Sequence, residues 1–214
     1  MPGEISRRTV IASAAIVPVA ALTAGVEAGQ AQTPAPSSSA LSDAQLRLLA
    51  AFVDRLIPKD ELGPSASESG VPEYVNRSLA DFLAAEKPAF IEGLEATDAF
   101  AHRSQDRAFV DLTPQQQDAV LTAMESGSAA GFANARVFFN RVRRLTLEGM
   151  CGDPYYGGNK DFAGWDLIKY PGPRLASTPA EQKMGVEIKP YHHSAYPSGA
   201  GSGGQGPAGE HHGH

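Results

Sequence analysis

The chain has 214 residues, with 18 Lys and Arg against 24 Asp and Glu, and a formal net charge of −6. This acidic balance argues against a nucleic-acid-binding protein, which needs a basic face to neutralise phosphates. The single cysteine excludes an internal disulfide framework and any zinc or iron–sulfur site built from cysteines alone.

The first 31 residues predict a twin-arginine export signal that is removed by cleavage after Ala31. Arg7 and Arg8 stand directly before an uncharged stretch that runs from residue 9 to residue 26. An uncleaved membrane anchor is the alternative, because about 18 apolar residues just span a bilayer. Pro18 and the richness of the stretch in Ala, Ser and Thr disfavour an anchor. We therefore expect a periplasmic protein whose mature chain has no membrane span.

Residues 32–41 predict a polar linker, and residues 42–149 predict a helical domain. The first helix begins at Ser42, where Gln45 completes a capping box, and it ends before Pro58. A loop rich in proline, glycine and serine continues to residue 71.

Two further helices follow this loop. Pro72 begins the first of them, which counts Phe82 among its apolar residues and is broken by the dipeptide at 87–88. The next predicted helix places apolar residues on one face between residues 90 and 101.

The last two predicted helices have clearer ends. Thr113 is an N-cap with proline after it and Gln116 at the third helical position. The final helix runs from about residue 132 to Leu147, and Gly149 terminates it. We count Leu147 among the apolar residues of this helix. These patterns predict an all-α protein, with a small domain of about five helices and a long irregular C-terminal extension.

The last 65 residues have little periodicity. We divide them into a docking segment, residues 150–175, and an extended tail rich in Gly and His, residues 176–214. A structureless stretch of this length is either disordered or ordered by lying on another protein. The aromatic residues of the docking segment favour the second explanation, so we expect it to wrap a partner subunit. The residues expected to dock are Asp153, Tyr155, Tyr156, Gly157, Gly158, Asn159 and Trp165.

Three motifs give the sequence its resemblance to a known family. The first is Phe52 with residues 54–58 (Asp-Arg-Leu-Ile-Pro). The second is Leu147 and Gly149 with residues 153–159 (Asp-Pro-Tyr-Tyr-Gly-Gly-Asn), and the third is Gly164-Trp165 followed by residues 170–172 (Tyr-Pro-Gly). With them, residues 42–175 resemble the gluconate 2-dehydrogenase subunit 3 family. Its members are the small, or gamma, subunits of membrane-associated FAD-dependent sugar or sugar-acid dehydrogenases.

The resemblance implies a non-catalytic subunit with no catalytic, cofactor-binding or metal-binding residues of its own. FAD is then expected in a large catalytic flavoprotein of the glucose–methanol–choline (GMC) type, and haem in a multihaem cytochrome c subunit. These partners would associate the complex with the inner membrane, and the small subunit would escort export and maturation of the flavoprotein. The twin-arginine route fits this role, because it carries proteins already folded and can carry a partner that lacks a signal.

Two other classes of protein are open alternatives. An independent periplasmic binding or structural protein would have no redox partner. A free-standing enzyme is disfavoured, because the sequence offers no nucleophile–base pair or metal constellation, and residues 153–159 do not have the spacing of a nucleotide-binding glycine loop. The five histidines of the last 23 residues lie on a tail with no core to hold a metal site.

Cys151 is an unpaired cysteine beside the proposed docking residues. In an oxidising compartment, such a residue indicates either an intermolecular disulfide or a free thiol. We hypothesise a bridge to the large subunit, with a buried free thiol as the alternative.

Overall fold

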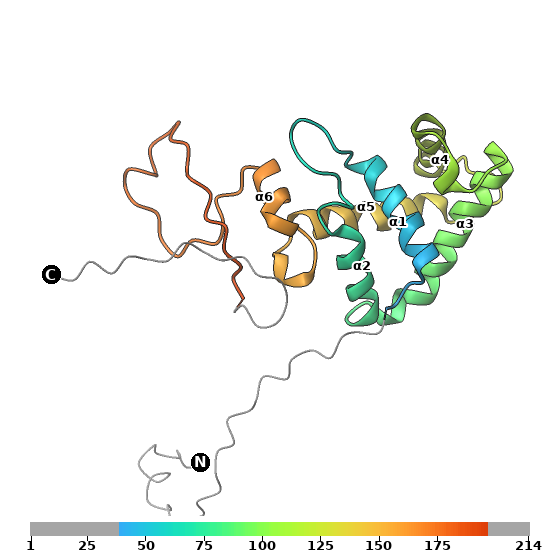
Figure 1. Cartoon of the computed structure of the whole chain (residues 1–214), viewed down its shortest axis with the longest axis horizontal. Helices are drawn as coiled ribbons and strands as arrows, with labels where there is room; N and C mark the ends of the chain where they lie inside the picture. Colours follow the sequence, from blue (N-terminus) through green and yellow to red (C-terminus); the bar gives the residue numbers. More distant parts are fainter. Residues whose placement is uncertain (1–38, 197–214) are drawn as a thin grey trace, which may run out of the picture. The chain divides into compact units, whose positions relative to one another are not determined.

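The computed structural model describes residues 39–196, which contain six α-helices and no β-strand (Figure 1). The helices are α1 (Asp43–Leu56), α2 (Val71–Ala80), α3 (Lys87–Gln105), α4 (Pro114–Ser126), α5 (Ala135–Cys151) and α6 (Ala163–Leu167). Short 3₁₀ turns are η2 (Ala84–Glu86), η3 (Phe109–Asp111), η4 (Pro154–Tyr156) and η5 (Lys160–Phe162). The prediction of an all-α fold is confirmed. Arg7, Arg8 and the proposed cleavage site lie outside the described residues.

The two predicted capping boxes are present. The backbone N–H of Gln45 donates to the Ser42 hydroxyl at 3.3 Å, and the N–H of Ser42 donates to Gln45 Oε1 at 2.9 Å. Thr113 and Gln116 repeat this exchange at 3.3 and 3.0 Å at the start of α4. Both boxes satisfy N–H groups that have no partner inside the helix, so they define where α1 and α4 begin.

Helix α5 is the central element, because α1, α2, α3 and α4 all pack against it. Its Phe138 ring meets the buried Phe52 ring of α1 edge-on, with centroids 6.4 Å apart. Gly93 of α3 makes room for this ring, since a Cβ there would lie 2.2 Å from Phe138 Cδ2. The core therefore depends on one small residue facing one large ring.

The predicted end of the last helix at Gly149 is wrong. Helix α5 continues through Gly149 to Cys151, and Gly152 is the residue that leaves the helix. Gly149 is required for packing, since a Cβ there would lie only 2.8 Å from Cδ1 of Tyr74 on α2. A glycine inside a helix can thus mark a close neighbour and not a terminus.

The second helix is also shorter than predicted. It ends at Ala80, and Asp81 leaves helical geometry at φ −123° and ψ −108°. Phe82 is consequently 61 % exposed and not part of the core. Pro88 lies in the first turn of α3, where proline is tolerated, so the 87–88 dipeptide begins that helix and does not break α2.

None of the helices within residues 39–196 has an apolar stretch long enough to span a bilayer.

Candidate functional site

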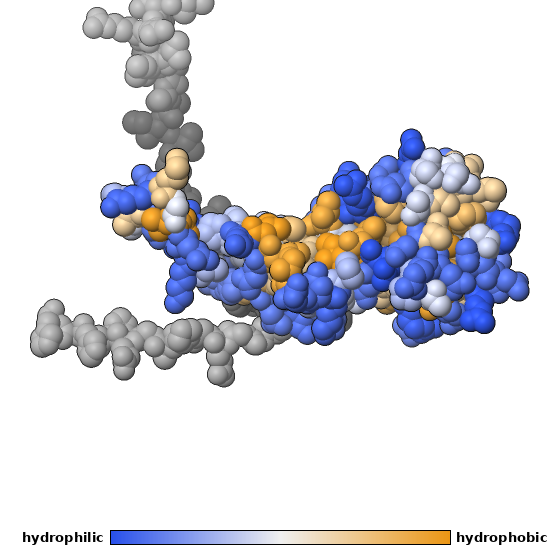
Figure 2. All heavy atoms as spheres, turned by 90° about the horizontal axis from the view of Figure 1, so that it is seen from above, coloured by the Kyte–Doolittle hydropathy of each residue, from blue (hydrophilic) through white to orange (hydrophobic). Residues whose placement is uncertain are grey.

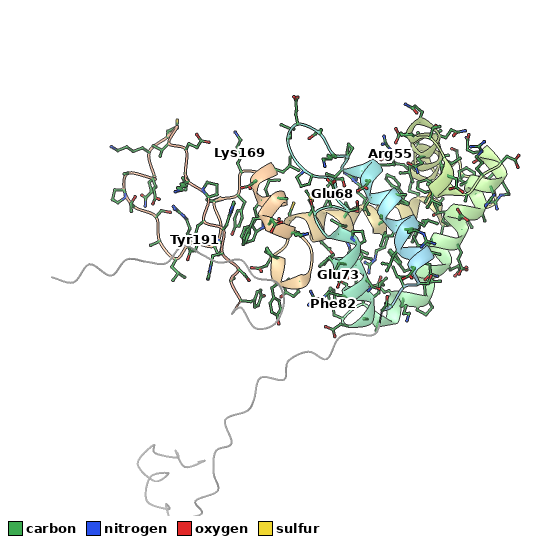
Figure 3. The ribbon with its side chains drawn as sticks, in the orientation of Figure 1. Arg55, Glu68, Glu73, Phe82, Lys169 and Tyr191 are labelled. Atoms are coloured by element: carbon green, nitrogen blue, oxygen red, sulfur yellow. The ribbon has the colours of Figure 1, made fainter. Side chains whose placement is uncertain are left out.

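An open apolar groove of about 590 Å³ lies where the ends of α2 and α5 meet the turn η4. We call it the α2–α5 groove. It is lined by Tyr74, Phe82, Leu147, Glu148, Cys151, Gly152, Asp153 and Tyr156. Figure 3 labels Phe82, which lies beyond the end of α2. The large side chains of Phe82, Leu147 and Tyr156 thus reach solvent in one groove.

Leu147 and Phe82 were not expected at this surface. Leu147 is 49 % exposed, whereas Leu145, two residues earlier on α5, is fully buried. A separation of two residues places side chains on different faces of a helix, so the sequence carried a signal that Leu147 lies off the buried stripe. The sequence carries no such signal for Phe82, because the exposure of this residue depends on where α2 ends.

The floor of the groove contains a polar pair. The Tyr74 hydroxyl donates to Glu148 Oε2 at 3.2 Å, and burial raises the pKa of Tyr74 above its ordinary value. Arg144 Nε lies 3.4 Å from the other Glu148 oxygen. The groove therefore combines apolar walls with a negatively charged group at one side.

Cys151 contributes its half-buried side chain to the same groove. Burial raises the pKa of its thiol, so the group is protonated at neutral pH and reacts slowly. Its side chain therefore forms part of the groove lining.

Asn159 organises the docking segment from inside. Its side chain is fully buried, and its Nδ2 donates to the carbonyl oxygen of Gly152 at 2.8 Å. Its Oδ1 accepts the backbone N–H of Gly164 at 2.8 Å. Asn159 also has a left-handed backbone, φ +48°, which asparagine tolerates better than most residues. One side chain thereby joins the end of α5 to the start of α6.

The glycines of this segment allow its backbone to touch α5. A Cβ on Gly158 would lie 2.1 Å from the carbonyl oxygen of Gly149, and one on Gly164 would lie 1.6 Å from that of Met150. The expectation that the segment wraps a partner subunit stays a prediction. At Gly158 and Asn159 the order comes from this chain's own helix.

Trp165, predicted to dock, is buried at 4 % exposure. Its indole packs edge-on against Tyr170, with ring centroids 5.0 Å apart. Any effect of Trp165 on a partner is therefore indirect, through the shape of the segment. Gly157, also predicted to dock, adopts φ +99° at the end of η4, a conformation that favours glycine.

The other predicted docking residues remain at the surface. Tyr155 and Tyr156 are 44 % and 41 % exposed, and their rings meet edge-on at 5.3 Å. Asp153 caps their turn by accepting the N–H of Tyr155 at 2.9 Å. Of the predicted set, only Tyr155 and Tyr156 are exposed.

The early motif at residues 54–58 has a structural part in the site. Asp54 accepts hydrogen bonds from the backbone N–H and the hydroxyl of Ser67 at 2.8 and 2.7 Å, which holds the loop before α2. The next residues of that loop hold the docking segment, since Lys160 N–H donates to the Ser69 carbonyl at 2.9 Å. The loop before α2 therefore connects the first motif to Lys160, the residue that follows the second motif.

A second, smaller recess of about 140 Å³ lies between this loop and α6. Its apolar lining includes Ile57, Met150 and Leu167. Figure 2 shows apolar side chains gathered on this face of the molecule. Leu62 and Ile168 are exposed at 72 % and 55 %.

The described histidines do not form a metal site. His192 Nε2 lies 2.8 Å from Asp166 Oδ1, and within residues 39–196 no three His, Cys, Asp or Glu side chains come together as metal ligands. His211, His212 and His214 lie outside the described part of the chain.

Comparison with known proteins gives one match. A family model described as gluconate 2-dehydrogenase subunit 3 matches residues 43–172. No curated protein and no solved structure matches the chain. The matched range begins with α1 and includes both the α2–α5 groove and most of the docking segment, so the family resemblance seen in the sequence is confirmed.

Proposed function

The chain belongs to the gluconate 2-dehydrogenase subunit 3 family, and on that premise we propose that it is the non-catalytic small subunit of a periplasmic FAD-dependent sugar or sugar-acid dehydrogenase. In this role it escorts the catalytic flavoprotein through export and maturation and stabilises it afterwards. FAD belongs to that GMC-type partner. A multihaem cytochrome c subunit receives the electrons and associates the complex with the inner membrane.

The α2–α5 groove is the observation that supports docking most directly. Phe82, Leu147 and Tyr156 expose apolar or aromatic surface together, next to the half-buried Cys151. Such clusters are typical of protein interfaces, where burying them excludes water from large side chains. Aromatic residues are also the commonest binding hot spots. The groove is therefore the surface on which we place the flavoprotein.

The order of the docking segment supports the same proposal. Asn159 and Trp165 tie the segment to α5 before any partner binds. A surface that is already ordered loses little conformational entropy on association. Tyr155 and Tyr156 are thus presented in a conformation that suits docking.

The export signal supports the escort role. Arg7 and Arg8 stand in a leader of the type that carries folded proteins. A flavoprotein without its own leader can then cross the membrane only while bound to this chain.

The test is to co-express the chain with its GMC-type flavoprotein partner and to measure flavoprotein in the periplasm. We expect the double variant Arg7→Lys, Arg8→Lys to keep both proteins in the cytoplasm, although it preserves the charge of the leader. A flavoprotein that reaches the periplasm in equal amount without the small chain overturns the escort role. A chain that always purifies alone supports an independent periplasmic protein instead.

A further inference from the structure

Residues 191–196, which we call the clasp, run back across the docking segment. The Ser194 hydroxyl donates to Asp153 Oδ1 at 2.6 Å, and the N–H of Ala195 donates to Asp153 Oδ2 at 2.8 Å. The Tyr156 hydroxyl donates to the Tyr196 hydroxyl at 2.7 Å, and the Tyr196 ring stacks on Tyr155 with centroids 4.7 Å apart. The clasp thus contacts the exposed residues of the turn η4.

A second contact fixes the other end of the clasp. The His192 ring stacks on Phe162, with centroids 4.8 Å apart and an interplanar angle of 6°. Its Nε2 lies 2.8 Å from Asp166 Oδ1. Phe162 has φ +62°, a conformation that is uncommon outside glycine, and this places its ring beside His192.

The clasp closes the base of a loop, residues 172–190, which we call the arm. Tyr191, labelled in Figure 3, donates its backbone N–H to the Pro171 carbonyl at 3.0 Å. Gly172 permits this closure, since at φ +87° a Cβ there would lie 2.1 Å from the Tyr191 carbonyl oxygen. The two ends of the arm, which are about twenty residues apart in the sequence, are therefore held side by side.

The arm also has internal order. Arg174 Nη1 lies 2.6 Å from Glu181 Oε1, and Thr178 N–H donates to the other Glu181 oxygen at 2.8 Å. These hydrogen bonds lower the pKa of Glu181 to about 2. The carboxylate is therefore charged at every physiological pH and holds the start of the arm to its middle.

This ordered arm presents apolar side chains to solvent. Leu175 and Met184 are fully exposed, and Val186 is 45 % exposed. Within residues 39–196 nothing covers Leu175 or Met184. In this position Leu175 and Met184 expose a large apolar surface to water, and burying that surface in a partner would be favourable.

We propose that the arm is a second docking element, which inserts Leu175 and Met184 into an apolar recess of the same flavoprotein subunit. This inference rests on the proposed function. Continuity of surface assigns the occupant, because Tyr196 of the clasp contacts Tyr156, and Tyr156 lines the α2–α5 groove. A partner seated on the groove therefore meets the base of the arm.

Met184 provides a specific probe of this contact. The other described methionines, Met124 and Met150, are buried at 0 % and 1 % exposure. Dilute hydrogen peroxide should therefore oxidise Met184 first in the full chain. In the complex with the purified GMC-type flavoprotein partner, we expect oxidation of Met184 to be at least tenfold slower, as measured by peptide mass spectrometry.

A double variant tests the energetic role. Leu175→Ser with Met184→Ser should raise the Kd for the flavoprotein at least tenfold. Val137→Ser is the matched control, because Val137 is 70 % exposed at the amino end of α5, away from the groove. We expect the control to bind like the natural chain.

The outcomes separate this inference from the proposed function. If the complex forms while Met184 reacts as fast as in the free chain, the arm does not dock, and the small-subunit role stands. If the chain alone forms a dimer in which Met184 is protected, the occupant is a second copy and the proposal is wrong. If no complex with the flavoprotein forms, the proposed function and the arm contact both fail.

Discussion

The indole Nε1 of Trp165 donates a hydrogen bond to the backbone carbonyl of Cys151 at 2.9 Å. This bond joins α6 to the last residue of α5, whose carbonyl has no partner inside the helix. Cys151 also lines the α2–α5 groove. Trp165 therefore supports one wall of the groove from behind.

Replacing Trp165 with Phe keeps an aromatic ring in the site but removes the N–H donor. The Cys151 carbonyl loses its partner, and we expect the free energy of unfolding to fall by about 1–3 kcal/mol. Trp165→Ala also leaves a cavity and should cost about 3–5 kcal/mol. Urea unfolding followed by circular dichroism measures both, since Trp165 is the only tryptophan and fluorescence is lost with it. A Trp165→Phe variant of unchanged stability would show that the hydrogen bond contributes nothing.

Gly149→Ala tests the close contact between α5 and α2. The new Cβ would lie 2.8 Å from Tyr74 Cδ1. Overpacking of this kind costs about 1–3 kcal/mol, against about 1 kcal/mol that alanine gains over glycine inside a helix. We expect a net loss of up to about 2 kcal/mol in urea unfolding. Gly63→Ala is the control, because no atom lies within 4 Å of its new Cβ; equal stability of the two variants would contradict the packing role.

The groove itself is tested by Phe82→Ser combined with Leu147→Ser. Both side chains are about half exposed or more, so the stability of the free chain should change by no more than about 0.5 kcal/mol. Binding to the flavoprotein should weaken at least tenfold, or about 1.4 kcal/mol, because the partner loses two apolar contacts. Titration calorimetry measures the Kd, with Val137→Ser as control. Unchanged binding would show that the flavoprotein does not dock on the groove.

We predict a disulfide bond between Cys151 and the partner flavoprotein. Non-reducing electrophoresis of the purified complex should show one band at the summed mass of the two subunits, which reduction or Cys151→Ser separates. A flavoprotein band that stays at its own mass without reductant excludes the disulfide.

The thiol of the free chain should react slowly. Burial raises the pKa of Cys151, so at pH 8 the reactive thiolate is scarcer in the folded chain than in the unfolded chain. Alkylation by iodoacetamide should therefore accelerate when urea is added at constant pH, and the folded chain should react faster only as the pH rises above the ordinary thiol value. Equal rates with and without urea would show that the thiol is not protected by the fold.

Local sequence patterns were sufficient for the starts of α1 and α4. Ser42 with Gln45, and Thr113 with Gln116, exchange hydrogen bonds across three residues. Each box is complete within one turn of chain, so the residue types alone indicate it. Phe52 of α1 and Leu145 of α5, which belong to sets of apolar residues at helical spacing, are both fully buried.

The structural role of several glycines could not be predicted from their neighbours in the sequence. Gly149 was interpreted as a helix terminator, but it faces Tyr74, about seventy-five residues earlier in the chain. Gly158 was predicted to dock, and the structure shows in addition that its backbone approaches the carbonyl oxygen of Gly149 in α5. In each case glycine avoids a Cβ clash, and only the folded chain shows which atom would clash.

The residue pattern by itself established the family, the helical class, and the aromatic, glycine-rich stretch on which function was expected to depend. The α2–α5 groove emerged only when the chain folded, since Phe82, Leu147 and Tyr156 come from three separate segments. Periodicity reports which face of one helix avoids water. It does not report which apolar residues remain uncovered after all helices have packed, because that depends on where each helix ends and what lies against it.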